Sequence, residues 1–133
     1  MVKLVIYDDE YPELTEVIIK ANRKNINCLT YSDATKLYQE LEEGILTDFD
    51  IFLTDLEFEK VIAYENRTFR DSKIITGVDL AKKVRQLYPN RPIIIQSAYE
   101  LPQKSEFHDY FFQKPFDIKE TLLPALDEII KLL

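Results

Sequence analysis

The chain has 133 residues, of which 46% are hydrophobic and 31% are charged, a composition typical of a globular protein that forms one domain over residues 1–133. It carries 24 acidic and 17 basic residues, and a formal net charge of -7 disfavours direct binding to nucleic acid. No apolar run is long enough to span a membrane, and the chain does not begin with a secretory signal pattern, which predicts a cytoplasmic protein. The single cysteine, Cys28, is predicted to be a buried filler of a strand.

Five short apolar runs predict β-strands, at residues 2–7, 26–31, 49–54, 93–96 and 110–113. Helical patterns separate them. Apolar residues recur at three- and four-residue spacing over residues 14–21, 34–41, 80–88 and 122–133. This alternation of strand and helix is typical of a doubly wound α/β fold with a parallel sheet.

The ends of several predicted helices carry capping signals. Ser32 or Asp33 is expected to cap the second helix, and Gly44 to end it. Thr76 followed by Asp79 resembles a capping box. Thr121 is expected to cap the terminal helix, with Pro124 in its first turn, because a proline in the helix interior would cost about 3 kcal/mol.

Polar residues follow four of the predicted strands at the points where the strands end. They are Asp8 and Asp9, Asp55, Ser97, and Lys114. The ends of parallel strands lie together, so these side chains are expected to converge. Clustered carboxylates favour a bound Mg²⁺, which prefers oxygen ligands. A carboxylate can be a nucleophile toward phosphorus, while lysine and serine can stabilise a phosphoryl group.

Each of these residues alone has a simpler interpretation. Asp55 suits a turn, and the Asp8–Asp9 pair suits a solvated first helical turn. Ser97 alone is more often a cap, and Lys114 before a proline is usually exposed. These interpretations would have to hold together at four matching strand ends, which favours one shared site.

The motifs at the strand ends resemble those of the receiver domain of two-component response regulators, which are CheY-like proteins. The motifs are Tyr-Asp-Asp-Glu at 7–10, Leu-Thr-Asp-Leu at 53–56, Gln-Ser-Ala at 96–98 and Gln-Lys-Pro-Phe at 113–116. They occur in the family's order over nearly the whole chain. The resemblance implies a flavodoxin-like (βα)5 fold with strand order 2-1-3-4-5.

The resemblance also implies roles for the acidic residues. Asp55 would be the phosphoacceptor, and Asp9 the direct ligand of Mg²⁺, with Asp8 acting through water. Asp55 and the backbone carbonyl of Glu57 would complete the metal shell.

The remaining roles implied by the resemblance concern the phosphoryl group and the response to it. Lys114 would pair with the phosphoryl group, Ser97 would move toward it, and Phe111 would change rotamer with Ser97. The bond between Lys114 and Pro115 is often cis in this family. The donor would be a histidine kinase or a histidine phosphotransfer protein. The domain would be a switch that assists its own phosphorylation and dephosphorylation, rather than an enzyme. A downstream protein or a second copy of the chain would read it.

Two segments depart from the receiver pattern. The glycine that begins the third helix in receivers is here Gly77, twenty-two positions after Asp55, so the loop after the third strand has gained residues 58–73. A small hairpin at 61–70 is one expectation for this insertion, and it is either a lid or docking element or an ordered surface elaboration. The segment between Ser97 and Lys114 is short and contains Pro102, which predicts a shortened fourth helix.

Two other functional classes compete with the phosphorylated switch. One is a degenerate, receiver-like interaction module that takes no phosphoryl group. The other is a phosphohydrolase of the haloacid dehalogenase type, which has a second Asp two positions after its nucleophile, on the first strand. Here Glu57 holds that position and Asp55 leaves the third strand, which argues against the hydrolase.

Overall fold

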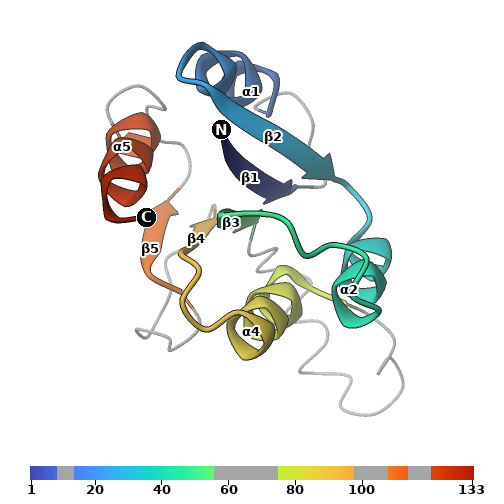
Figure 1. Cartoon of the computed structure of the whole chain (residues 1–133). Helices are drawn as coiled ribbons and strands as arrows, with labels where there is room; N and C mark the ends of the chain where they lie inside the picture. The colour runs from blue at the N-terminus through green and yellow to red at the C-terminus, as the bar shows by residue number, and fades with distance from the viewer. Residues whose placement is uncertain (9–13, 56–74, 98–107, 114–120) are drawn as a thin grey trace.

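The computed structural model describes residues 1–8, 14–55, 75–97, 108–113 and 121–133. Five parallel strands form one sheet in the order β2-β1-β3-β4-β5, as the resemblance implies. Figure 1 shows α1 and α5 on one side of this sheet and α2 and α4 on the other. The described part of the chain is therefore a three-layer, flavodoxin-like α/β fold.

The described strands and helices follow one another in the order that the apolar pattern predicts. The strands are β1 (Val2–Tyr7), β2 (Ile26–Tyr31), β3 (Ile51–Asp55), β4 (Ile93–Ser97) and β5 (Tyr110–Gln113). The helices in the described residues are α1 (Leu14–Arg23), α2 (Ala34–Glu42), α4 (Gly77–Leu87) and α5 (Leu123–Leu132).

Successive side chains of each strand point to opposite faces of the sheet, so the core is divided into two clusters, one on each face. Ile6, Leu53 and Ile94 lie in one row across three strands and pack toward α1 and α5. Phe52 and Ile93 pair in another row and pack toward α2 and α4. The central strands are buried on both faces, which explains their near-continuous apolar sequence.

Two of the predicted helix caps are confirmed. The Asp33 side chain accepts a hydrogen bond from the backbone N–H of Lys36 at 3.2 Å and caps α2. Thr76 and Asp79 form a complete capping box at the start of α4, with each side chain bonded to the other residue's backbone N–H. Both caps fix the point where the chain enters a helix after a loop.

The predicted start of the terminal helix is wrong by one residue. Leu122 rather than Thr121 is the N-cap, and no side chain caps the helix there. Leu122 already has helical backbone angles, since Thr121 and Leu122 form a wider helical turn that continues into α5. Pro124 lies in the first turn, as expected.

The third strand begins two residues later than predicted. Phe49 is apolar for a different reason, because its ring is buried and packs edge-on against Tyr88 at 5.4 Å between ring centroids. Arg91 stacks on both rings, 3.9 Å from the centroid of Tyr88 and 4.5 Å from that of Phe49. Burial of a loop residue thus gave the sequence the appearance of a longer strand.

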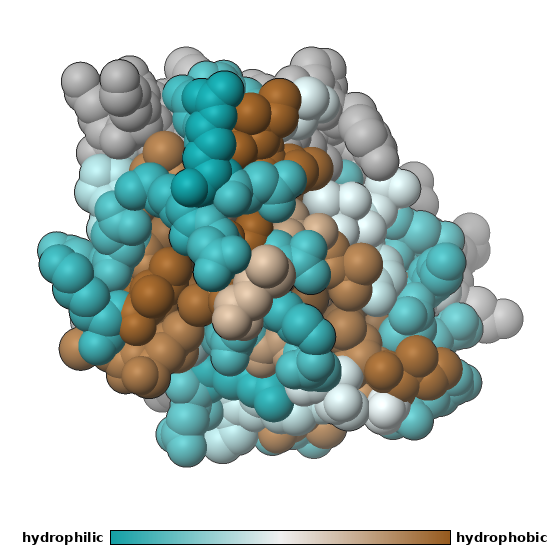
Figure 2. Space-filling model, turned by 45° about the horizontal axis from the view of Figure 1, so that its top comes forward, coloured by the Kyte–Doolittle hydropathy of each residue, from teal (hydrophilic) through white to brown (hydrophobic). Residues whose placement is uncertain are grey.

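Cys28 lies in β2 as predicted, but it is half-buried rather than fully buried. Burial raises the pKa of its thiol to about 11, so the reactive thiolate is scarce at neutral pH. Among the described residues, no helix has the length and apolar character needed to cross a membrane. In Figure 2, apolar surface on the face shown is broken up by polar side chains.

Candidate functional site

Residues from three neighbouring strands form one row at the carboxyl end of the sheet, where the strands finish. Tyr7 on β1 pairs with Thr54 on β3, so the next residues, Asp8 directly after β1 and Asp55 at the end of β3, lie side by side. Asp55 in turn pairs with Gln96 on β4. The parallel register therefore brings together two carboxylates that are far apart in the sequence.

All three side chains in this row are buried. Asp8 is 1% exposed, Asp55 8% and Gln96 5%. The side-chain amide of Gln96 donates a hydrogen bond from Nε2 to Oδ2 of Asp8 at 3.2 Å. A buried carboxylate is costly unless hydrogen bonds or opposite charge compensate it, and this amide supplies one such bond.

Ser97 and Phe111 occupy the places that the sequence predicts for them. Ser97 ends β4 at the same end of the sheet as Asp55, and it is 1% exposed. Phe111 lies on β5, partly buried against the cluster under α2 and α4, and the ring of His108 approaches it edge-on at 6.4 Å between centroids. Both positions suit the predicted switch roles, which stay predictions.

The other predicted site residues, Asp9, Glu57 and Lys114, lie outside the described residues. So do the Lys114–Pro115 bond, the insertion at 58–73 and the segment at 98–107. Their parts in metal binding, phosphoryl pairing and docking stay predictions from the sequence.

Gly77 lies against the backbone of the predicted phosphoacceptor. A Cβ atom at this position would lie 1.8 Å from the carbonyl oxygen of Asp55 and 3.1 Å from Oγ1 of Thr54. Only glycine fits here, because the nearest atom belongs to the backbone and cannot rotate away. The start of α4 is thereby packed directly onto the end of β3.

The described carboxylates fit a magnesium site in the chemistry of their donors. Asp8 and Asp55 supply hard oxygen ligands from adjacent strands, of the kind that Mg²⁺ prefers. Within the residues that the structure describes, no group of three or more metal-ligating side chains comes together. The predicted third donor, Asp9, and the predicted carbonyl of Glu57 lie outside that part of the chain.

The end of β2 lies beside the row of Asp8, Asp55 and Gln96, next to Asp8. The backbone N–H of Asp8 donates to the carbonyl of Tyr31 at 3.1 Å. The phenol of Tyr31 donates to Oε1 of Glu40 on α2 at 3.1 Å. Burial, followed by the hydrogen bond and the charge of Glu40, raises the pKa of Tyr31 to about 12. Tyr31 therefore stays protonated and ties the end of β2 to α2.

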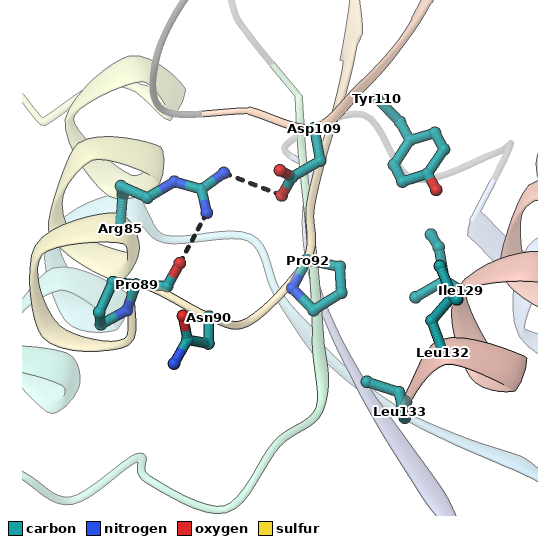
Figure 3. A pocket seen from close by; sticks show the side chains of 9 residues that line it. All are labelled: Arg85, Pro89, Asn90, Pro92, Asp109, Tyr110, Ile129, Leu132 and Leu133. Atoms are coloured by element: carbon teal, nitrogen blue, oxygen red, sulfur yellow. Dashed lines mark hydrogen bonds and ion pairs between the residues drawn. The ribbon is translucent and has the colours of Figure 1, made fainter.

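A pocket of about 290 Å³ lies at the opposite, amino end of the sheet (Figure 3). Arg85 on α4 forms one wall, with Nη2 2.8 Å from Oδ2 of Asp109 and Nη1 3.0 Å from the carbonyl oxygen of Pro89. Ile129 and Leu132 of α5 form the facing wall. None of the predicted site residues in the described part of the chain lines this pocket.

Gln96 belongs to one of the strand-end motifs, but no role for it was predicted from the sequence. A usable signal was present, because Gln96 directly follows an Ile-Ile-Ile run in a buried strand. A buried amide requires a hydrogen-bond partner, and the partner proved to be Asp8. The contact between Gly77 and Asp55 had no signal beyond the resemblance, because twenty-two positions separate the two residues.

Comparison with known proteins gives structural neighbours only. No protein-family model and no curated protein sequence matches the chain. The response regulator TrrA from Thermotoga maritima, solved with Mg²⁺ and BeF, is 17% identical with a TM-score of 0.70, over 97% of this chain and 99% of that one. Chemotaxis protein CheY4 from Vibrio cholerae is 21% identical with a TM-score of 0.69, over 97% and 98% of the two chains.

Another neighbour is TrrA in complex with the histidine kinase ThkA, 17% identical with a TM-score of 0.67, over 97% of this chain and 98% of that one. At these identities the likeness shows the fold. The chain therefore has the fold of CheY-like response-regulator receiver domains over nearly its whole length.

Proposed function

We propose that this protein is a phosphoacceptor receiver of a two-component or phosphorelay system, phosphorylated on Asp55. The observation that carries the proposal is the row at the carboxyl end of the sheet, in which Asp55 ends β3 directly beside Asp8. Ser97 ends the next strand at the same end of the sheet. These positions support the proposal, because the receiver motifs put the phosphoacceptor, an acidic residue and a serine at strand ends.

The proposed reaction transfers one phosphoryl group from a phosphohistidine to Asp55. A carboxylate oxygen of Asp55 attacks phosphorus, a bond between oxygen and phosphorus forms, and the bond between nitrogen and phosphorus breaks. The imidazole leaves with the electron pair of that bond and takes up a proton. The product is an acyl phosphate on Asp55, and apart from the proton that the imidazole takes up, the transfer consumes and releases no other reactant.

The surrounding residues would serve this transfer through charge and position. Bound Mg²⁺ would neutralise charge that develops on the transferred oxygens. Asp8 and Asp9 would hold that cation, and the ammonium of Lys114 would pair with the phosphoryl group. Close packing of Gly77 on Asp55 fixes the backbone of the nucleophile, which reduces the freedom it must lose before attack.

The structural neighbours support the proposal through what they contain. TrrA was solved with Mg²⁺ and BeF and also in complex with a histidine kinase, and the DrrB receiver domain was solved activated by BeF3. We propose a histidine kinase or a histidine phosphotransfer protein as the donor for this chain as well.

The test is phosphoryl uptake by the purified protein. The chain is incubated with Mg²⁺ and a small phosphodonor, and intact mass reports the addition of one phosphoryl group. We expect uptake in the wild type and none in Asp55→Asn. Asp109→Asn is the matched control, because it makes the same chemical change at the opposite end of the sheet.

The same experiment separates the competing functions. A receiver retains a single hydroxylamine-sensitive phosphoryl group, whereas a phosphohydrolase releases phosphate over many turnovers. No uptake by the wild type, from the small donor or from a phosphorylated histidine kinase, would show that the chain is a degenerate module.

A further inference from the structure

The hydrogen bond between Gln96 and Asp8 joins two strands that are not neighbours. Gln96 lies on β4 and Asp8 follows β1, and β3 runs between these strands. Adjacent strands are about 4.8 Å apart, so the two backbones are separated by roughly 9.6 Å. The side chain of Gln96 must therefore reach across the place where Asp55 ends β3.

The amide of Gln96 can meet Asp8 because both side chains lie on the same face of the sheet. Ile94 packs toward α1 and α5, and side chains two residues apart point to the same face of a strand. Gln96 accordingly shares this face with Asp55, which lies two residues after Leu53 of the same cluster. The amide thus lies on the face shared by both carboxylates of the row.

We propose that Gln96 is a positioning residue of the Mg²⁺ site, which rests on the proposed function above. Its Nε2 donates to Oδ2 and so fixes the plane of the Asp8 carboxylate. A carboxylate held in one orientation loses less freedom when it holds the cation, directly or through water, and hydrogen-bond partners in a metal site contribute tenfold to a hundredfold to metal affinity. Gln96 acts through Asp8 and is not itself a ligand.

A purely structural role is the competing explanation. The Gln96 amide is 5% exposed, so its bond to Asp8 also stabilises the fold. The two explanations differ in one measurable quantity. A structural bond changes the free energy of unfolding without Mg²⁺, whereas a positioning bond also changes the affinity of the folded protein for Mg²⁺.

The experiment is a double-mutant cycle read by calorimetric titration of the full chain with MgCl₂. Gln96→Met keeps the side-chain volume and removes the donor. Gln96→Asn keeps the amide but is one methylene shorter, so it falls short of Asp8. We expect each variant to bind Mg²⁺ about tenfold more weakly than the wild type, at the lower end of the effects seen for such partners.

The second side of the cycle repeats Gln96→Met in an Asp8→Ala background. If Gln96 acts through Asp8, its amide has no carboxylate to orient in this background. Gln96→Met should then change Mg²⁺ affinity less than twofold. Asp109→Asn is the control for a polar change at the distant end of the sheet, and it should leave Mg²⁺ affinity unchanged.

The outcomes distinguish this inference from the proposed function. If the wild type binds Mg²⁺ and both Gln96 variants bind it equally well, the positioning role is refuted and the receiver function stands. An equal loss from Gln96→Met with and without Asp8 would also refute the role. A wild type that binds no Mg²⁺ at all would overturn the site and the inference together.

Discussion

Acidic residues have different surroundings at the two ends of the sheet. At the amino end, acids pair with bases close to the surface: Lys3 with Asp48, and Arg85 with Asp109. The hydrogen bond and the charge of Lys3 lower the pKa of Asp48. At the carboxyl end, Asp8 and Asp55 are buried side by side, and Asp8 accepts a hydrogen bond from the neutral amide of Gln96.

This difference fits the proposal that the amino end serves structure and the carboxyl end serves chemistry. A surface pair of opposite charges already has its counter-ion and adds modestly to stability. Two adjacent buried carboxylates repel each other, and a cation relieves that repulsion. The same residue type therefore fastens strands at one end of the sheet and forms the proposed reaction site at the other.

The largest expected effect is at the carboxyl end, from Gly77→Ala. The added methyl group would collide with the backbone of Asp55, and we expect a loss of about 3 kcal/mol in the free energy of unfolding. Urea denaturation measures it. Gly44→Ala is the matched control, because Gly44 has a φ of +72° but open space around it, so about 1 kcal/mol is expected. Similar losses in both variants would contradict the close packing of α4 on β3.

The next effect is at the amino end, from Asp109→Ala. The carboxylate accepts from Arg85 and also from the backbone N–H of Ile93 at 2.8 Å. Since the pair is partly exposed, we expect a loss of about 1–2 kcal/mol by urea denaturation. Arg85→Met removes the ion pair and the exposed hydrogen bond to the carbonyl of Pro89, but it keeps the bond from the Ile93 N–H to Asp109, so it should cost less. Calorimetric titration should give wild-type Mg²⁺ affinity for both variants, and weakened binding would break the contrast between the two ends.

Magnesium itself should stabilise the folded chain through the carboxyl end. At ten times its dissociation constant, a ligand that binds only the native state adds about 1.4 kcal/mol. Thermal unfolding in MgCl₂ and in EDTA measures this difference. It should be much smaller in Asp8→Ala at the same MgCl₂ concentration, because that variant binds the cation more weakly, and it should persist in Arg85→Met. A difference unaffected by Asp8→Ala would place the cation elsewhere.

The smallest effect is expected at Tyr31, which ends β2 beside the proposed site. Because its pKa is about 12 in the folded chain and its ordinary value is 10.0, folding favours the protonated phenol. That stability is fully present below pH 10 and is lost as the pH rises toward 12. Tyr31→Phe should cost about 0.5–1 kcal/mol at neutral pH, from the lost hydrogen bond to Glu40.

Urea denaturation at pH 7 and at pH 11 tests the pH dependence. The wild type should lose more stability than Tyr31→Phe over this interval, because only the wild type has this phenol to titrate. Equal losses would show that the phenol does not couple to folding.

The sequence alone determined the order of the described strands and helices, and it predicted the end of each strand to within one residue. Apolar runs of strand length and helical stripes are local patterns, and burial on both faces of β3 and β4 imposes them directly on the sequence. The start of β3 was misplaced because a buried loop residue, Phe49, has the same apolar character as a strand residue.

Tertiary structure alone decided which side chains meet. The register of three parallel strands places Asp8, Asp55 and Gln96 in one row, and no local pattern encodes that register. Tertiary structure likewise set Gly77 against the carbonyl of Asp55, although the two residues are twenty-two positions apart in the sequence. Contacts of this kind depend on long-range pairing and close packing, which arise only when distant segments fold against one another.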